Sequence, residues 1–295
     1  MAEDHPQYKD RLFNFIFGSE ENKAWTLSLY NAINGSDYTD PNAIEIATIK
    51  EIMYLGMRND VAFIIAEEMN LFEHQATYNP NMPLRLMQYA GNLYEKYIME
   101  RKLNKYGKTL VRLPAPKLVV FYNGTDEQED ETILKLSDSF PEGADFDIEV
   151  KVRMLNVNYG RNRKLLEACK PLSEYAWIVQ EVRKNKTRED LDSAIDRAIA
   201  DMPDDFFIKP FLMAHRAEVK GMLLTEYNEA ETMELFKEEG REEGREEGRK
   251  EGRMEGQLEK AKQAALNLLR IGKLTLAEIA ESVGLPMGEI QKIAR

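Results

Sequence analysis

Cysteine and histidine are scarce in this chain of 295 residues. Its one cysteine, Cys169, excludes a disulfide within the chain and fits a reducing compartment. The three histidines, His5, His74 and His215, are far apart in the sequence and lack the spacing of a zinc site. Cys169 lies in an apolar helical stretch, where we expect a small buried side chain rather than a nucleophile.

Long hydrophobic runs are also missing. No window approaches the roughly 20 apolar residues that a transmembrane helix needs. The first residues, MAEDHPQYKDR, have no apolar segment of the signal-peptide type. We therefore expect a soluble, cytoplasmic protein with no membrane partner.

Positive charge is in short supply, with 40 Lys and Arg against 52 Asp and Glu and a net charge of −12. Binding to nucleic-acid phosphates needs a basic surface, so the overall charge opposes it. A DNA enzyme of this composition would need a local basic surface. Hydrophobic residues make up 43% of the chain, which is enough for a folded core in one large domain with an appendage or in two domains.

The stretch 60–85, DVAFIIAEEMNLFEHQATYNPNMPLR, carries the most informative pattern. It predicts two apolar strands, 61–66 and 71–76, joined by a four-residue connection at 67–70. Side chains alternate along a strand, so Asp60, Glu73 and Gln75 are expected on one face beside the small Ala62. Carboxylates on an apolar sheet are costly to bury unless something compensates them, and a divalent cation does so.

These residues carry a family resemblance. Asp60, the run Glu73-His74-Gln75, the segment 79–85 (NPNMPLR) and Tyr89 resemble the recombination-promoting nuclease and transposase family, part of the PD-(D/E)xK superfamily. The similarity is close over about residues 8–125 and looser beyond. It implies an α/β fold with a restriction-endonuclease-like core, in which helices flank a central mixed sheet, and a helical C-terminal extension.

The resemblance also implies a set of site residues. Asp60 and Glu73 would bind Mg²⁺, or Mn²⁺ or Ca²⁺ in its place, and Gln75 would stand where the superfamily usually has lysine. A glutamine can orient a water molecule but cannot act as a general base. Glu21, with Glu20 next, is the candidate for an acid on the first helix.

Two residues of the following helix complete the set. Arg85 resembles the family's arginine, and it and Gln88 are candidates for contact with DNA or with the metal-binding carboxylates. Each residue also has a simpler interpretation. Acids such as Glu21 suit the start of any helix, Arg85 can form a structural ion pair, and His74 should pack on the opposite face from Glu73.

One geometric difficulty follows from the four-residue connection. It pairs Glu73 with Ile64 and Gln75 with Ala62, which leaves Asp60 four residues, or roughly 13 Å, from the level of Glu73. Two ligands of one ion must converge, so the first strand is expected to bend at Asp60.

Strands concentrate in the first half of the chain and helices in the second. Further strands are expected within 43–56, 117–123 and 147–157, and a helix from Pro83 with Leu84, Met87, Gly91, Tyr94 and Ile98 on its buried face. After Asn162 the pattern is helical, including 206–236. The expected organisation is a nuclease-like core at 1–160, a helical part at 161–236, a repeat at 237–256 and a small helical segment at 257–295.

The repeat places glycine at every fourth residue from Gly240 to Gly256, between arginines and glutamates. Each glycine costs about 1 kcal/mol of helix propensity, so the repeat is either a marginal helix or tether, or a helix that self-associates into a homo-oligomer. Beyond it, Thr275 and Glu278 form a capping-box pair, and Ala280, Gly284 and Ile290 have helix-turn-helix spacing. That segment is either a DNA reader or a small cap or oligomerisation element.

Two functions remain open at the level of the sequence. The first is a metal-dependent DNA endonuclease that hydrolyses phosphodiester bonds, similar to nucleases linked to recombination and mobile DNA. The second is a catalytically weak or inactive nuclease-fold protein that serves as an interaction or assembly module. A DNA-binding regulator that acts through the C-terminal helices is a third alternative.

Overall fold

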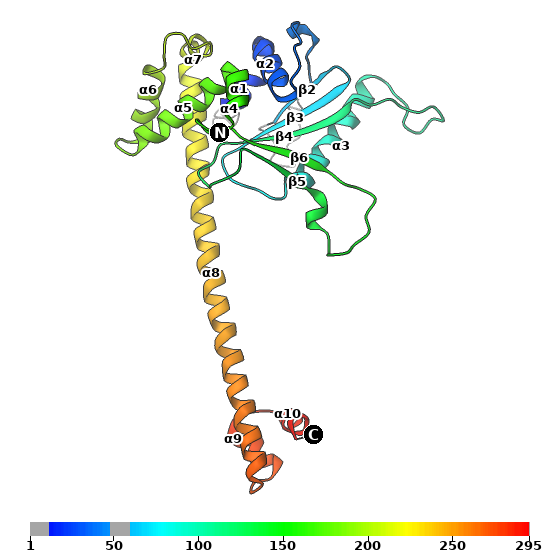
Figure 1. Ribbon diagram of the computed structural model, residues 1–295, viewed down its shortest axis with the longest axis vertical. Helices are drawn as coiled ribbons and strands as arrows, with labels where there is room; N and C mark the ends of the chain where they lie inside the picture. The colour runs from blue at the N-terminus through cyan, green and yellow to red at the C-terminus, as the bar shows by residue number, and fades with distance from the viewer. Residues whose placement is uncertain (1–11, 48–59, 295) are drawn as a thin grey trace, which may run out of the picture. The chain divides into compact units, whose positions relative to one another are not determined.

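A six-stranded mixed sheet organises the first part of the chain (Figure 1). The computed structural model describes residues 12–47 and 60–294. The strand order is β1-β2-β3-β4-β6-β5, and helices flank the sheet, which confirms the α/β class. The strands are β1 (Glu45–Ile46), β2 (Asp60–Ile65), β3 (Glu68–Gln75), β4 (Ala115–Tyr122), β5 (Glu131–Lys135) and β6 (Lys151–Asn156).

The centre of the sheet is parallel and its edges are antiparallel. Strand β4 runs parallel to β3 and to β6, whereas β2 pairs with β3, β1 with β2, and β5 with β6 in the antiparallel sense. The apolar run 117–123 lies mostly in β4, as its sequence predicts for a central strand. The strand expected within 43–56 appears as β1, and residues 48–56 lie outside the described part of the chain.

Each face of the sheet has its own core. One face packs Phe72 and Phe121 against α1 (Leu12–Phe17), α2 (Lys23–Asn34) and α5 (Lys170–Lys186). The other face packs Leu71 and Val120 against α3 (Met82–Glu100). Successive residues of β3 therefore point into different cores, and polar side chains of this strand are buried on either side.

Helix α3 buries a different stripe from the one expected. Its buried side chains include Leu86, Tyr89, Ala90 and Leu93, while Leu84 is exposed, so the expected face was wrong. Apolar residues occur at several phases of this helix, and contact with the sheet selects one of them. In this orientation of α3, Arg85 faces β3.

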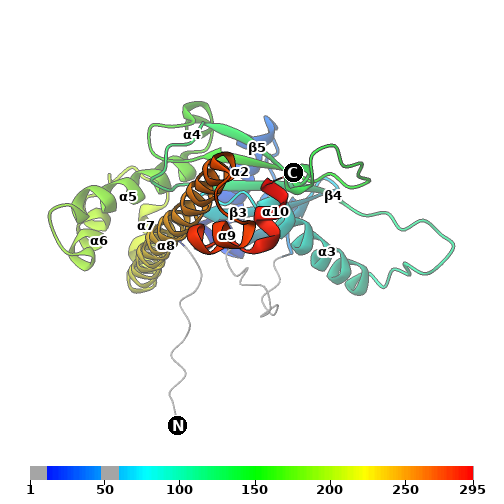
Figure 2. The ribbon, with the colours of Figure 1, turned by 90° about the horizontal axis from the view of Figure 1, so that it is seen from below.

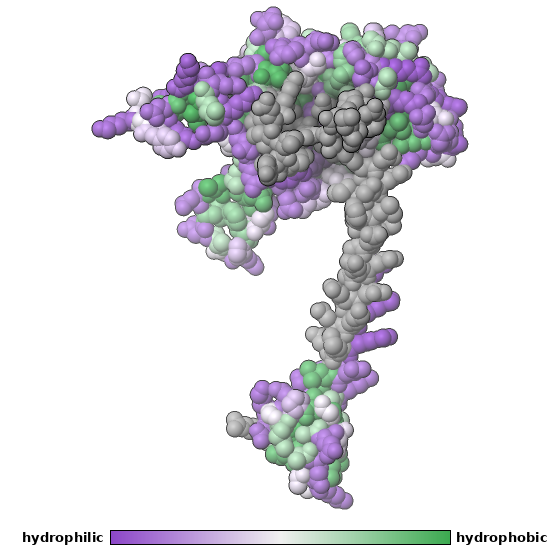
Figure 3. Space-filling model, turned by 180° about the vertical axis from the view of Figure 1, so that it is seen from behind, coloured by the Kyte–Doolittle hydropathy of each residue, from purple (hydrophilic) through white to green (hydrophobic). Residues whose placement is uncertain are grey.

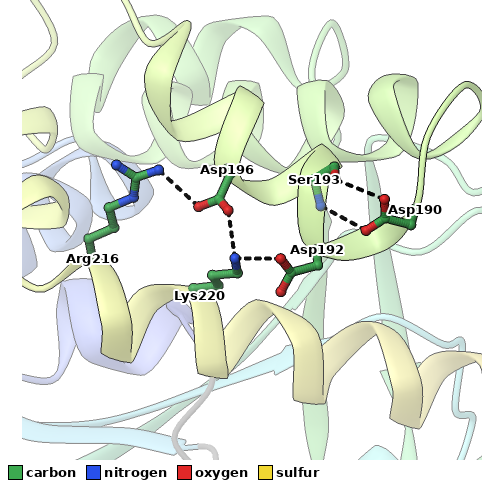
Figure 4. A network of polar contacts seen from close by, with 6 residues as sticks. All are labelled: Asp190, Asp192, Ser193, Asp196, Arg216 and Lys220. Atoms are coloured by element: carbon green, nitrogen blue, oxygen red, sulfur yellow. Dashed lines mark hydrogen bonds and ion pairs between the residues drawn. The ribbon is translucent and has the colours of Figure 1, made fainter.

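The remaining helices of this part follow the second half of the sequence. They are α4 (Arg163–Ala168), α6 (Leu191–Ala200), α7 (Lys209–Ala214) and the start of α8 (Arg216–Ile271), with short 3₁₀ helices at Glu20–Asn22, Pro41–Ala43 and Leu136–Ser139. An ion-pair network holds α8 to α6 (Figure 4). Asp196 accepts from Arg216 at 2.9 Å and from Lys220 at 2.6 Å. The contact with Lys220, followed by that with Arg216, lowers the pKa of Asp196.

The chain divides into two compact units, Met1–Ala230 and Glu231–Arg295, with the boundary inside α8. The second unit contains α9 (Leu276–Val283) and α10 (Met287–Ile293), and its small core includes Ala265, Ile279, Leu285 and Ile290. The expected capping box of Thr275 and Glu278 is present, and Gly272 and Gly284 have φ of 67° and 69° after helix ends. The backbone of the glycine repeat is helical. No helix in the described residues is long and apolar enough to span a membrane.

Candidate functional site

A two-residue turn, Ala66-Glu67, joins β2 and β3, and both residues have positive φ (50° and 61°). The expected four-residue connection was therefore wrong. Met69 and Asn70 belong to the second strand, where both are buried. Two successive left-handed residues match the twist of a tight hairpin, so the strands pair from the turn outwards without a gap.

This turn changes the register at the site. Asp60 pairs with Glu73, and Ala62 pairs with Leu71. Directly opposed residues of an antiparallel pair have Cα atoms about 4.5–5.5 Å apart and side chains on the same face. The expected 13 Å offset is therefore absent, and no bend at Asp60 is needed. The side chain of Asp60 lies outside the described part, so its placement here is that of the backbone.

Glu73 is a buried carboxylate, with 2% of its surface exposed. One oxygen, Oε1, accepts from Arg85 Nη2 at 2.9 Å and from Gln75 Nε2 at 3.5 Å. The other oxygen, Oε2, is buried and has no hydrogen-bond partner in the described structure. The carboxylate is thus compensated on one side only.

The groups around Glu73 come from two adjoining elements. Gln75 is the next residue of β3 on the same face, and its Nε2 also lies 2.8 Å from the sulfur of Met82 at the start of α3. Arg85 follows one turn later, and its side chain is 30% exposed. The orientation of α3 that buries Leu86 also places this guanidinium next to Glu73.

A buried acceptor without a partner favours a cation or a donor at that position. Carboxylate oxygens are the ligands preferred by Mg²⁺ and Ca²⁺, so Glu73 Oε2 fits the expected ion, and the backbone of Asp60 lies directly opposite Glu73. Among the described residues, no three or more His, Cys, Asp or Glu side chains form a group that could hold a metal ion. The described contribution to such a site is Glu73 alone.

Two predicted residues have no described contact with Glu73. Glu21 is exposed, and its N–H donates to Ser19 Oγ at 3.3 Å at the start of the 3₁₀ helix. Gln88 is exposed one turn after Arg85 on α3. In the structure, the side chains of Gln75 and Arg85 therefore contact Glu73, and Asp60 pairs with Glu73 across the hairpin. Glu21 and Gln88 are on the surface.

No protein family, curated protein or solved structure matches this chain. The family resemblance of residues 60–89 therefore stays a prediction, and the chemistry of the hairpin is the basis for inferring function.

His74 lies on the opposite face from Glu73, as predicted. Its Nε2 is 2.7 Å from the hydroxyl of Tyr175 on α5, and its ring stacks on Phe13 with centroids 5.3 Å apart. Asn123 donates to the same hydroxyl at 3.0 Å, and Arg183 donates to the carbonyl of Asn123. This buried network lies behind the candidate site and was not expected. The only sequence signal was a polar residue, Asn123, directly after the apolar run of β4.

A polar cavity of about 560 Å³ opens beyond the ends of β4 and β6. Asp126, Glu127 and Gln128 line it together with Arg161, Arg183 and Lys184. Arg183 donates to Asn158 Oδ1 at 2.7 Å, and Arg161 pairs with Glu127 at 3.7 Å. Both acidic and basic side chains line this cavity, so it does not present a surface of one charge.

Proposed function

We propose that this protein is a metal-dependent DNA endonuclease with a PD-(D/E)xK core, in which β2 and β3 carry the active site. The observation that carries the proposal is the register of the hairpin. Asp60 opposes Glu73, and Glu73 presents a buried oxygen without a partner. The parallel β3-β4-β6 centre of the sheet and the helices on both faces support the expected core.

The roles of Glu73, Gln75 and Arg85 follow from their contacts, and that of Asp60 follows from its register in the hairpin. Glu73 and Asp60 would hold Mg²⁺ or Mn²⁺. Such an ion would polarise the scissile phosphate and lower the pKa of an attacking water molecule. Gln75 can hydrogen-bond and orient that water, because its amide lies on the same face as Glu73. Arg85 holds Oε1 of Glu73 and so leaves Oε2 as the free acceptor.

The test is nicking of supercoiled plasmid DNA by the purified protein with Mg²⁺ or Mn²⁺. Asp60→Ala and Glu73→Ala should each abolish nicking. Glu142→Ala removes an exposed acid elsewhere and serves as the matched control, which should keep full activity. If the site variants nick as well as the wild type, Asp60 and Glu73 are not the catalytic residues.

The second candidate function is an interaction module that keeps the nuclease fold. The ion pair of Arg85 with Glu73 favours it, because a guanidinium already compensates part of the buried charge without a metal. The absence of the usual lysine, replaced by Gln75, and the net charge of −12 point the same way. No nicking with any divalent metal, together with no effect of Mg²⁺ or Mn²⁺ on thermal stability, would favour this function over the first.

A further inference from the structure

The loop between α3 and β4, residues 101–114, is a basic exposed segment that follows the end of α3, the helix that carries Arg85 near its start. From 101 to 117 the sequence has six basic residues and no acid (Arg101, Lys102, Lys105, Lys108, Arg112 and Lys117), in a chain with a net charge of −12. The loop projects from the sheet beyond α3 (Figures 1 and 2). In the space-filling view this projection is mostly hydrophilic (Figure 3).

Local contacts hold the two ends of the loop. The N–H of Tyr106 donates to Asn104 Oδ1 at 3.0 Å in a turn, and the hydroxyl of Tyr94 donates to the carbonyl of Pro114 at 2.7 Å. Arg101 pairs with Glu45 at 2.8 Å, and Lys105 pairs with Glu95 at 2.5 Å. These two cations attach the loop to β1 and α3.

Three other cationic side chains of the loop are available to bind a partner. Lys102, Lys108 and Arg112 are exposed, and none forms an ion pair with any described residue. Tyr106, with 89% of its surface exposed, lies between them in the sequence. Lysine, arginine, asparagine, threonine and tyrosine side chains are those that contact nucleic-acid phosphates, and the loop combines them without an acid.

We propose that the loop 101–114 binds the phosphate backbone of the DNA duplex that the hairpin site cleaves, which rests on the proposed nuclease function. Helix α3 connects the two places, since Arg85 contacts Glu73 near its start and Arg101 follows its end. The sixteen residues from Arg85 to Arg101 rise by about 24 Å, or about seven base pairs. A duplex along α3 would reach both, and the loop supplies the local basic surface that the overall charge lacks.

The test compares two full-length triple variants. Lys102→Gln, Lys108→Gln and Arg112→Gln remove the three cations of the loop. Lys135→Gln, Lys164→Gln and Arg188→Gln remove three exposed cations elsewhere in the first unit, none of which forms an ion pair with a described residue. Fluorescence anisotropy with a labelled duplex of about twenty base pairs, in Ca²⁺ and in EDTA, gives the affinity across a range of salt concentrations.

The loop variant should bind DNA about tenfold or more weakly at physiological salt, and its plot of log K against log salt should be shallower by about three. The control variant should stay within about twofold of the wild type. Equal binding of DNA by the loop variant and the control would overturn the proposal. Binding to phosphatidylserine vesicles is measured beside it, and a loop variant that loses affinity for the vesicles but not for the duplex would also overturn the proposal.

Nicking assays separate this proposal from the nuclease function. A wild type that nicks plasmid through Glu73, with a loop variant that binds and nicks normally, overturns the loop proposal alone. A wild type that binds duplex through the loop but does not nick with any metal overturns the nuclease function and keeps the DNA surface. A wild type that neither binds nor nicks overturns both.

Discussion

Glu73 Oε1 accepts from Arg85, whereas Oε2 is buried with no hydrogen-bond partner among the described residues, and this asymmetry can be measured. Removing one partner of a buried ion pair leaves an uncompensated charge. Arg85→Ala should therefore lower the free energy of unfolding by about 2–3 kcal/mol in EDTA, as measured by urea denaturation. Adding Glu73→Gln to it removes the charge and should restore most of the loss.

The single variants Arg85→Ala and Glu73→Gln, compared with the wild type, test metal binding without an activity assay. If a divalent ion binds at Oε2, Mg²⁺ or Mn²⁺ should raise the melting temperature of Arg85→Ala and of the wild type, but not of Glu73→Gln. An equal shift in all three proteins would mean that the ion binds elsewhere.

Cys169 offers a second prediction at a single residue. Its side chain is fully buried, and burial raises the pKa of the thiol to about 11. The folded protein should therefore not react with iodoacetamide at pH 8, whereas the protein in urea should take up one label. Labelling of the folded protein at the rate of the unfolded chain would contradict this burial.

The raised pKa also sets a direction for stability. Between about pH 9 and pH 11 the unfolded chain releases the thiol proton while the folded chain keeps it, so this group's stabilisation is lost as the pH rises. Cys169→Ala should show a smaller decline in this window.

At the scale of elements, the hairpin turn is a place where the chain is strained. Ala66 and Glu67 both have positive φ, which costs residues with a Cβ about 1–2 kcal/mol each. Ala66→Asn with Glu67→Gly places the preferred pair of a type I′ turn there and should raise the free energy of unfolding by about 1 kcal/mol, once the greater flexibility of glycine in the unfolded chain is counted. Ala66→Val should lower it. Urea denaturation measures both, and a stabilising valine would show that the turn is of another type.

The same turn explains how far the sequence could predict the site. The apolar alternation of 60–75 was enough to predict two strands, and the parity of Asp60, Glu73 and Gln75 follows from it. The register could not be predicted, because Ala66-Glu67 has none of the glycine or asparagine that marks a tight hairpin. The polar residues Glu67, Glu68 and Asn70 therefore suggested a longer loop.

The contact of Arg85 with Glu73 could not be predicted either, because it depends on the orientation of α3. Arg85 was recognised as a candidate, but apolar residues at several phases of α3 do not determine which side faces the sheet. Only the packing of Leu86, Tyr89 and Leu93 on the sheet decides it. The resemblance proposed candidate residues, and tertiary contact decided which of them meet.

At the scale of the whole molecule, the charge is unevenly distributed along the chain. The net charge of −12 coexists with a segment, 101–117, that has six basic residues and no acid. The net charge of the whole chain therefore says little about the charge of one surface. The objection that a chain of net charge −12 opposes DNA binding does not apply to a locally basic segment. A run of cations in a loop between two elements was visible in the sequence, but its exposure was not.

The two units allow the functions assigned to them to be separated. Glu73, Arg85 and the loop 101–114 all belong to the first unit, while Ala265, Ile279 and Ile290 form a separate core in the second. Ile290→Asp buries an unpaired charge in that small core and should unfold it, with loss of helical circular-dichroism signal. Nicking and duplex affinity should stay within about twofold of the wild type, since the residues that carry them have their own core. Truncation after Lys237 should give the same result. Loss of DNA affinity in both variants would instead identify a DNA-binding regulator that acts through α9 and α10, because Ile290→Asp keeps every residue of the first unit in place.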